Sequence, residues 1–259
     1  MPLSGLKLII YPDLISLYSF LNKNLAPRFM EAKKDKDQNN ILKAYNLLLY
    51  FAGSMVMYEP VEECVVDFWS NGILSKLPVS SRNPRFMEAA SKLRCSCEDK
   101  VTCKEILMKD YNKLFAGAGQ SVASPIKSNY LVDTAVNGSG HKTEGVGDFY
   151  DSYGWRFRSR YSIPDDNLGI ELLFLTKLND QYIILDDEAC RREMRNEIRR
   201  FIEKHLLSWL PKWNQRVQEN AGTMCYKGIA TLIYASCEDI FNLLDNSIPL
   251  TDFTVAVKN

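Results

Sequence analysis

The sequence predicts an all-α protein, built as one helical domain over its 259 residues. Apolar residues recur every three or four positions over most of the chain, which is the period of an amphipathic helix. Asn-Pro and Glu-Pro pairs precede several of these runs and glycines follow them, as at helix starts and ends. Segments typical of strands are few and short, at residues 8–11 and 253–257.

Four helices are expected in the first part of the chain, over residues 41–56, 60–72, 84–93 and 102–117. The last of these opens on a Thr-x-x-Glu capping box, in which two side chains satisfy free backbone N–H groups. The lysine-rich stretch at 33–37 is expected to be a solvated turn. The buried face of the first helix is expected to comprise Ile41, Tyr45, Leu48, Ala52 and Met55.

Glycine, serine and asparagine then interrupt the helical pattern. Residues 118–145 are expected to form a long loop between an N-terminal half, about 1–117, and a C-terminal half, about 146–245, which a tail follows. We expect residues 116–145 to be mobile, because few apolar side chains anchor them and glycines have the largest backbone freedom.

Helical spacing returns at residues 146–157. An apolar helix is expected from Pro164 to Leu178, and a charged amphipathic helix follows over 186–205. Further helical spacing covers 209–217 and 229–240. The faces expected to be buried in the apolar helix and in the last two helices comprise Leu168, Leu172, Leu175 and Leu178, then Trp209, Trp213 and Val217, and then Ile229, Leu232, Ile233 and Ile240. The inner side of the charged helix is expected to comprise Cys190, Met194, Ile198, Phe201 and His205.

Composition excludes some classes of protein. Lys and Arg total 32 and Asp and Glu total 32, so the net charge is +0, which argues against a strongly basic nucleic-acid binder. The apolar runs fall short of the ~20 residues that span a bilayer, and the first residues do not resemble a secretory signal. Seven cysteines, an odd number, fit a reducing compartment. We therefore expect a soluble, cytoplasmic protein.

One cysteine cluster could bind a metal ion. Cys95, Cys97 and Cys103 would supply three thiolates for zinc or an iron–sulfur cluster, and Cys64 or His141 would supply a fourth ligand. Their C-x-C-x5-C spacing is not a common pattern for either group. The alternative is three reduced thiols between helices.

Two other patterns give only weak indications of a phosphate-binding or catalytic site. Residues 138–143 look like the end of a phosphate-binding loop, but His141 separates the glycine from the lysine and no apolar strand precedes them. A flexible loop is expected there. Asp165 and Asp166 are adjacent, so on a helix they would point about 100° apart and could not act on one atom together. They either cap the helix or bind a ligand.

Four segments resemble the TorD/DmsD/NarJ family. Residues 110–117, DYNKLFAG, are similar to its Y-x-x-L-F-x-G element, and residues 125–131, PIKSNYL, to its P-W-E-S-V-Y-L segment. Residues 161–175, YSIPDDNLGIELLFL, resemble the signature P-x-D-H-(I/L)-x-x-E-(L/F)-x-F-(M/L). Residues 201–211, FIEKHLLSWLP, resemble F-x-x-x-H-L-x-x-W-x-P.

This sequence departs from the family pattern at three positions. Asn167 replaces the histidine of the Asp-His pair, and Ile126 and Lys127 replace the tryptophan and the acid of the loop segment. These positions fall where family members are thought to recognise peptide, so the resemblance implies the fold but not the exact ligand preference.

The resemblance implies a TorD-like helical bundle that acts as a chaperone and not as an enzyme. Such chaperones are cytoplasmic and serve molybdopterin-dependent oxidoreductases. They bind the twin-arginine signal peptide or the apoprotein of the catalytic subunit, assist cofactor insertion and hold back export until it is complete. Weak GTP binding is implied for some members. Members occur as monomers and as domain-swapped homodimers, and both states stay open here.

The resemblance places a peptide-binding site where the 125–131 segment approaches the start of the helix at Pro164. Two arginines followed by an apolar stretch require carboxylates beside an apolar groove. Asp166 and Glu171 are expected to supply the carboxylates, and Asp166 to contribute more than Asn167. The residues expected at this site are Phe115, Pro125, Ser128, Tyr130, Leu131, Pro164, Asp165, Asp166, Asn167 and Glu171.

Overall fold

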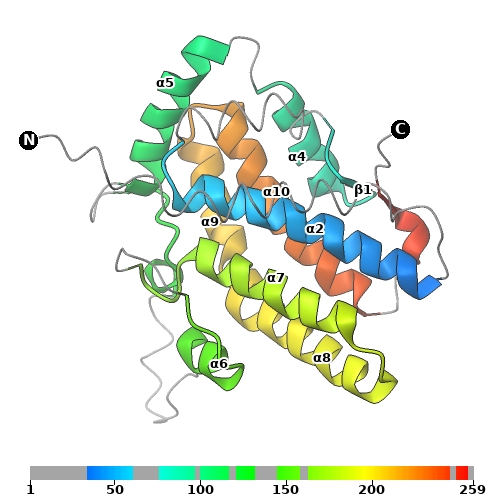
Figure 1. The fold of residues 1–259 in the computed structure, drawn as a ribbon. Helices are drawn as coiled ribbons and strands as arrows, with labels where there is room; N and C mark the ends of the chain where they lie inside the picture. Colours follow the sequence, from blue (N-terminus) through cyan, green and yellow to red (C-terminus); the bar gives the residue numbers. More distant parts are fainter. Residues whose placement is uncertain are drawn as a thin grey trace, which may run out of the picture.

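The computed structural model describes residues 34–60, 76–96, 100–116, 121–131, 145–157, 163–245 and 249–255, without the side chains of 34–36 and 100–103. Within these ranges it contains eight α-helices and one small sheet, which confirms the all-α class (Figure 1). The elements are α2 (Lys34–Met57), β1 (Val79–Ser81), α4 (Pro84–Arg94), α5 (Lys100–Tyr111), α6 (Val146–Ser152), α7 (Leu168–Ile184), α8 (Glu188–Phe201), α9 (Leu210–Asn220), α10 (Met224–Leu243) and β2 (Phe253–Val255). None of these helices is long and apolar enough to cross a membrane.

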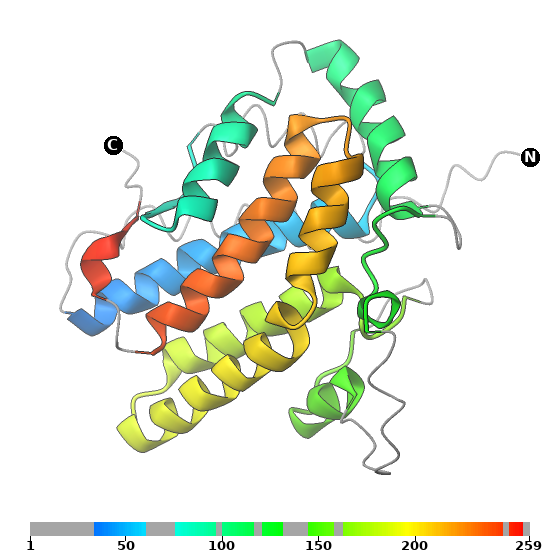
Figure 2. The same cartoon turned by 180° about the vertical axis from the view of Figure 1, so that it is seen from behind.

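The central helix is α10, which packs against α2, α4 and α9 (Figure 2). It is apolar around most of its circumference and buries residues on every turn, as expected of a helix enclosed by others. Besides α10, α2 also packs along α7, and α7 in turn packs on α8. The expected N-terminal and C-terminal halves therefore share one core.

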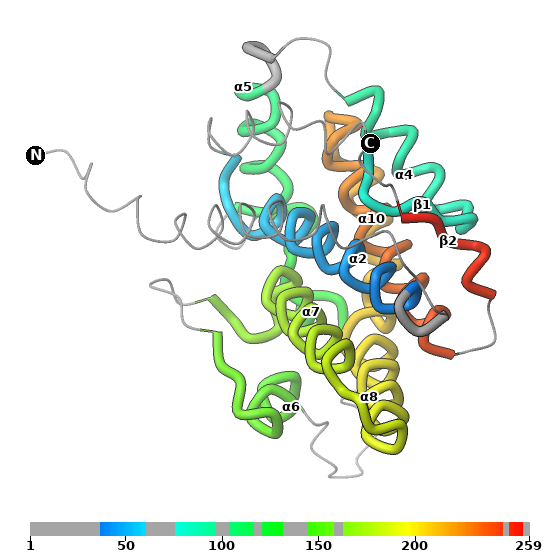
Figure 3. The backbone as a smooth tube through the Cα atoms, turned by 45° about the vertical axis from the view of Figure 1, so that its right-hand side comes forward, coloured from blue at the N-terminus to red at the C-terminus, as the bar shows by residue number. Residues whose placement is uncertain are grey.

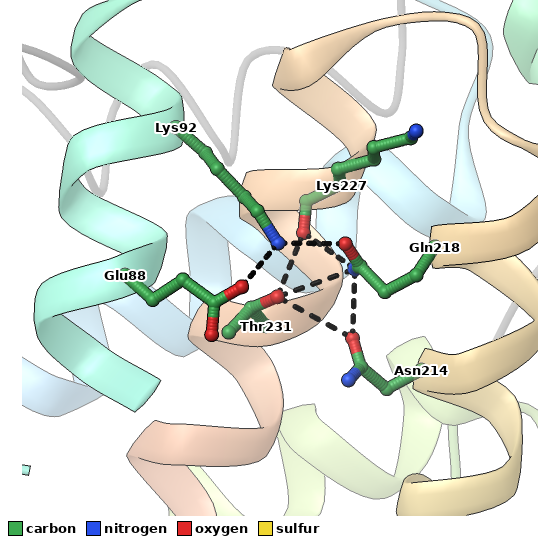
Figure 4. A network of polar contacts seen from close by, with 6 residues as sticks. All are labelled: Glu88, Lys92, Asn214, Gln218, Lys227 and Thr231. Carbon is green, nitrogen blue, oxygen red and sulfur yellow. Dashed lines mark hydrogen bonds and ion pairs between the residues drawn. The ribbon is translucent and has the colours of Figure 1, made fainter. Parts of the chain in front are cut away.

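A polar network joins three of these helices (Figure 4). The Lys92 ammonium on α4 donates to Glu88 Oε1 at 2.6 Å and to Gln218 Oε1 on α9 at 2.7 Å. The Gln218 amide donates onward to the Lys227 carbonyl at 2.9 Å and to Thr231 Oγ1 at 3.2 Å, both on α10. One glutamine side chain thus links α4 to α10.

The small sheet packs against α2 and α4. β1 pairs antiparallel with β2, with Ser80 opposite Thr254 (Figure 3). The strand expected at 253–257 is confirmed over 253–255. β1 is not predicted by the sequence, because three residues are too few to display an alternating pattern.

The predicted inner faces of the first helix, α9 and α10 are buried in the structure. Two helix starts differ from those expected. α2 begins at Lys34, so its described residues from 34 onward are helical and not a solvated turn. α5 begins at Lys100, two residues before the expected capping box. The helix at 60–72 and the strand at 8–11 lie outside the described residues.

Three helices in the C-terminal half also differ. α6 ends at Ser152 although helical spacing continues to 157. α7 begins at Leu168 and not at Pro164, because residues 163–167 form a turn. The charged helix ends at Phe201 and continues as a π-helical turn, Ile202–Leu207. Cys190, expected on its inner side, is exposed in the first turn of α8.

A glycine allows α2 and α7 to approach closely, and its replacement should be destabilising. A Cβ at Gly169 would lie 2.9 Å from Met57 Cβ and 3.2 Å from the Gly53 carbonyl, whereas a Cβ at Gly53 would meet ordinary contacts at 3.5 Å or more. We expect Gly169→Ala to lower the free energy of unfolding by about 1–3 kcal/mol. Gly53→Ala should be neutral or raise it by up to about 1 kcal/mol. Urea unfolding measures both, and equal stability of the two variants would contradict this account.

Candidate functional site

Residues 121–131, called the strap below, are joined to the start of α7. Leu168 N donates to the Pro125 carbonyl at 2.8 Å, and Lys127 N donates to the Asp166 carbonyl at 3.0 Å. Ile126 lies opposite Asn167 in an isolated antiparallel bridge. The two segments expected to meet therefore do so, through backbone hydrogen bonds that any sequence could form.

In the turn that precedes α7, Asn167 and Asp166 make different hydrogen bonds. Asn167 is the N-cap: its Oδ1 accepts from Gly169 N at 2.9 Å. Asp166 Oδ2 accepts from Ser128 N in the strap at 2.9 Å. The alternative in which Asp166 caps the helix is therefore wrong, because the next residue already satisfies the free N–H group.

The other end of the strap is fixed to the core. Ala123 N donates to the Leu114 carbonyl at 3.1 Å, and Trp213 Nε1 donates to the Ala123 carbonyl at 3.2 Å. Within the strap, the Asn129 amide donates to Ser124 Oγ at 2.7 Å. Part of the segment expected to be mobile is thus held at both ends. Residues 117–120 and 132–144 lie outside the described residues.

Beneath the strap lies a buried carboxyl group. Glu171 has no exposed surface, and its Oε2 accepts from Trp209 Nε1 at 3.2 Å. Its Oε1 is buried without a hydrogen-bond partner. Burial raises the pKa of Glu171 well above its usual value, and the Lys127 ammonium and the Trp209 indole only partly oppose this. Glu171, which is expected to pair with a peptide arginine, therefore has no carboxyl oxygen at the surface.

Lys127 links the strap to the π-helical turn. Its Nζ donates to the Lys204 carbonyl at 3.1 Å and lies 3.0 Å from His205 Nδ1. Burial lowers the pKa of Lys127, while the carboxylates of Glu171 and Asp166 oppose that shift. Both carboxylates therefore act on this one ammonium group.

His205 is a neutral acceptor in this contact. It is 2% exposed and stacks on Phe201 at 5.2 Å, and burial followed by the charge of Lys127 lowers its pKa to about 3. Since Nδ1 accepts from an ammonium, we assign the ring proton to Nε2. That atom is buried without a partner.

The surface above this cluster combines apolar and acidic groups. Leu131 is 42% exposed, Asp165 is exposed, and Asp166 is half-buried. Tyr130 lies between the Trp209 ring, at 5.3 Å, and the Arg216 guanidinium, at 4.7 Å. Burial raises the pKa of Tyr130 to about 12, against the opposing effect of Arg216.

The short helix α6 supports the turn from the other side. Tyr150 OH donates to the Asp165 carbonyl at 3.0 Å, and Phe149 contacts the His205 ring edge to face at 5.6 Å. Burial, reinforced by Glu171, Asp165 and Asp166, raises the pKa of Tyr150 far above its usual value. The hydroxyl therefore stays a donor to the turn.

The expected site residues separate into two groups. Ser128, Leu131, Pro164, Asp165 and Asp166 are exposed or half-buried around the junction. The others are buried, and one of them lies at the far end of the strap: Phe115 stacks at 6.3 Å on Trp213, which donates to the Ala123 carbonyl. His205, Trp209 and Tyr150 are not predicted at the site, whereas Lys127 is one of the positions at which the sequence departs from the family pattern. Trp209 and His205 lie in the fourth resembling segment, which was the available signal.

The metal and nucleotide hypotheses gain no support. Cys95 is exposed, whereas Cys97, the side chain of Cys103, Cys64 and His141 lie outside the described residues. No group of three or more His, Cys, Asp or Glu side chains that could hold a metal ion occurs in the described ranges. The glycine-rich segment at 138–143 also lies outside them.

His205 should make the protein sensitive to acid. Because its pKa is lowered from 6.5 to about 3 in the folded state, the unfolded chain binds more protons between these values. Its contribution to stability is complete above pH 6.5 and is lost as the pH falls towards 3. Relative to His205→Gln, which keeps an acceptor for Lys127, the wild type should lose up to about 1.4 kcal/mol per pH unit in this window. Parallel stability curves from pH 7 to 4 would contradict this.

Known proteins resemble the chain over the same region. A family model described as "Nitrate reductase delta subunit" matches residues 83–215, slightly over half the chain. The chain is 24% identical over 190 residues to a protein of Aliivibrio salmonicida named "Chaperone protein TorD", which covers 70% of this chain and 86% of that relative. Proteins of the same name from Vibrio cholerae and Vibrio vulnificus are 24% identical over 181 residues and 28% identical over 153 residues. These cover 70% and 59% of this chain, and 80% and 68% of the relatives.

Proposed function

The chain belongs to the TorD/NarJ family of maturation chaperones, which are not enzymes, and from this we propose that it is a cytoplasmic chaperone for a molybdopterin-dependent oxidoreductase. Its client is the catalytic subunit, bound through the twin-arginine signal peptide, through the apoprotein or through both. Binding assists cofactor insertion and delays export until insertion is complete.

The observation that carries this proposal is the junction of the strap with the start of α7. There the carboxylates of Asp165 and Asp166 lie on one turn, and the exposed Leu131 ends the strap that is bonded to that turn. Guanidinium groups pair best with carboxylates, and the apolar stretch that follows the two arginines needs an apolar surface. The junction offers both kinds of group.

The rigidity of the junction favours a role in peptide binding over a role in catalysis. The turn is fixed by the Asn167 cap, by Tyr150 and by the backbone bonds to the strap. A preorganised acidic surface loses little side-chain freedom when a peptide binds. The neutral, buried His205 is a poor general base, because its proton affinity lies far below that needed near neutral pH.

The test is capture of the client. The chain is used as bait in an extract of its host, next to a variant that carries Asp165→Asn and Asp166→Asn. We expect the catalytic subunit of a molybdoenzyme, with its signal peptide intact, to be enriched on the wild type and reduced on the variant. Absence of any such subunit from the wild-type sample would overturn the proposal.

A further inference from the structure

We propose that Lys127 is the internal occupant of a guanidinium-binding site beneath the strap, and that an arginine side chain of the bound peptide replaces it there. The Lys204 carbonyl and His205 Nδ1 accept from Lys127 Nζ, and the Glu171 carboxyl group attracts the same ammonium electrostatically. This inference deepens the proposed function and rests on it, because it assigns one client arginine to a named set of acceptors.

The cluster is a cation site by its charge. Glu171 is completely buried, and the ammonium of Lys127 is the opposing charge that acts on it. The charge of Asp166, in the turn before α7, also attracts this ammonium and opposes the lowering of the pKa of Lys127. The ammonium of Lys127 opposes the rise in the pKa of Glu171, so a cation at this position favours the ionised carboxylate.

An ammonium group fits this site incompletely. Lys127 Nζ is bonded to the Lys204 carbonyl and to His205, while Oε1 of Glu171 is left buried without a donor. A guanidinium carries five N–H donors in a planar fork and could reach a carboxylate and a carbonyl together. The unsatisfied oxygen therefore favours a guanidinium ligand over the lysine that now fills the site.

Lys127 can leave without unfolding the strap. The strap is held by backbone groups at Lys127 N and Ser128 N and by the Pro125 carbonyl, none of which involves the lysine side chain. The side chain itself is only half-buried. Its departure would cost the bonds to the Lys204 carbonyl and to His205, and both groups can accept from the incoming guanidinium.

The positive charges near the site set a limit on its affinity. Lys204 and Arg200 act on His205, and Arg216 lies over Tyr130. Together with Lys127 they oppose a second cation. Removal of the Lys127 charge should therefore strengthen cation binding, which is the reverse of the effect expected for a lysine that contacts an acidic client.

The experiment compares Lys127→Met with the wild type and with Lys127→Met/Glu171→Gln. Lys212→Met, an exposed lysine on α9, is the charge-matched control. Two probes are titrated: methylguanidinium chloride, followed by the NMR signal of the Trp209 indole N–H, and a twin-arginine peptide, followed by calorimetry. Thermal melts verify folding, and Lys127→Gln replaces Lys127→Met if the latter does not fold.

We expect Lys127→Met to bind methylguanidinium and to bind the peptide at least tenfold more tightly than the wild type does. The double variant Lys127→Met/Glu171→Gln should neither bind methylguanidinium nor bind the peptide more tightly than the wild type does. Lys212→Met should behave as the wild type. Methylguanidinium binding no stronger in Lys127→Met than in Lys212→Met would overturn the inference. If methylguanidinium binds Lys127→Met but no variant binds the peptide, the cation site stands and twin-arginine recognition is contradicted.

Discussion

Replacing Asp110 with alanine should lower the free energy of unfolding by about 3 kcal/mol, because it removes three hydrogen bonds to one carboxylate. Asp110, which is buried at the end of α5, accepts from Gly222 N at 2.9 Å, from Thr223 N at 2.9 Å and from Thr223 Oγ1 at 2.7 Å. Thr223 in turn is the N-cap of α10 and accepts from Tyr226 N. The substitution therefore frees the chain just before the central helix.

The matched variant is Asp110→Asn, which keeps one acceptor oxygen and the size of the side chain. We expect it to lose less stability than Asp110→Ala, although its amide N–H₂ group faces donors and cannot replace the second oxygen. Chemical unfolding of both proteins provides the comparison. A loss below about 1 kcal/mol for Asp110→Ala would show that the junction before α10 does not depend on this carboxylate.

Replacing Asp166 with asparagine should weaken the binding of a twin-arginine peptide by about 30-fold or more, the range typical for loss of one partner of a desolvated charge pair. The amide oxygen of the variant can still accept from Ser128 N, so the strap stays bonded to the turn. The charge, and with it the charge-assisted pairing to a guanidinium, is lost. The expected effect is therefore on binding and not on folding.

Two further variants separate this prediction from a structural effect. Asn167→Ala removes the cap of α7, so it should lose about 1 kcal/mol of stability and keep its affinity for the peptide. Asp166→Ala removes both the charge and the hydrogen bond to the strap, so it should lose stability as well as affinity for the peptide. Calorimetric titration and thermal melts provide the two readouts. Unchanged affinity in a folded Asp166→Asn would exclude Asp166 from the site.

The sequence predicts the fold well where helices are amphipathic or apolar and long. The faces expected to be buried in α2, α7 and α10 are buried in the structure. Apolar residues spaced at the 3.6-residue period of a helix lie on one face, and that face packs away from water. The start of α7 is predicted four residues too early. Pro164 is a common helix opener, but here Asn167 provides the cap and the backbone of Asp166 bonds to the strap. The position at which α7 begins therefore depends on contacts with the strap, and no local sequence pattern reveals those contacts.

The candidate site is predicted only in outline. The resemblance brings the strap to the start of α7, but it also assigns Glu171 to the pairing with a peptide arginine. In the structure α7 is enclosed on most sides, so its glutamate is buried with Trp209. The contact of Lys127 with His205 joins residues 78 positions apart. Spacing along the chain carries no information on such a pair.

Hydrogen–deuterium exchange of the full chain with and without a twin-arginine peptide tests most directly whether the junction of the strap with α7 is the binding surface. We predict that the peptide slows exchange in residues 124–131 and 164–171, and leaves the distant sheet formed by β1 and β2 unchanged. A matched peptide with both arginines replaced by glutamine should slow exchange in neither segment. Peptide-dependent protection confined to other helices, or equal protection by both peptides, would contradict the account.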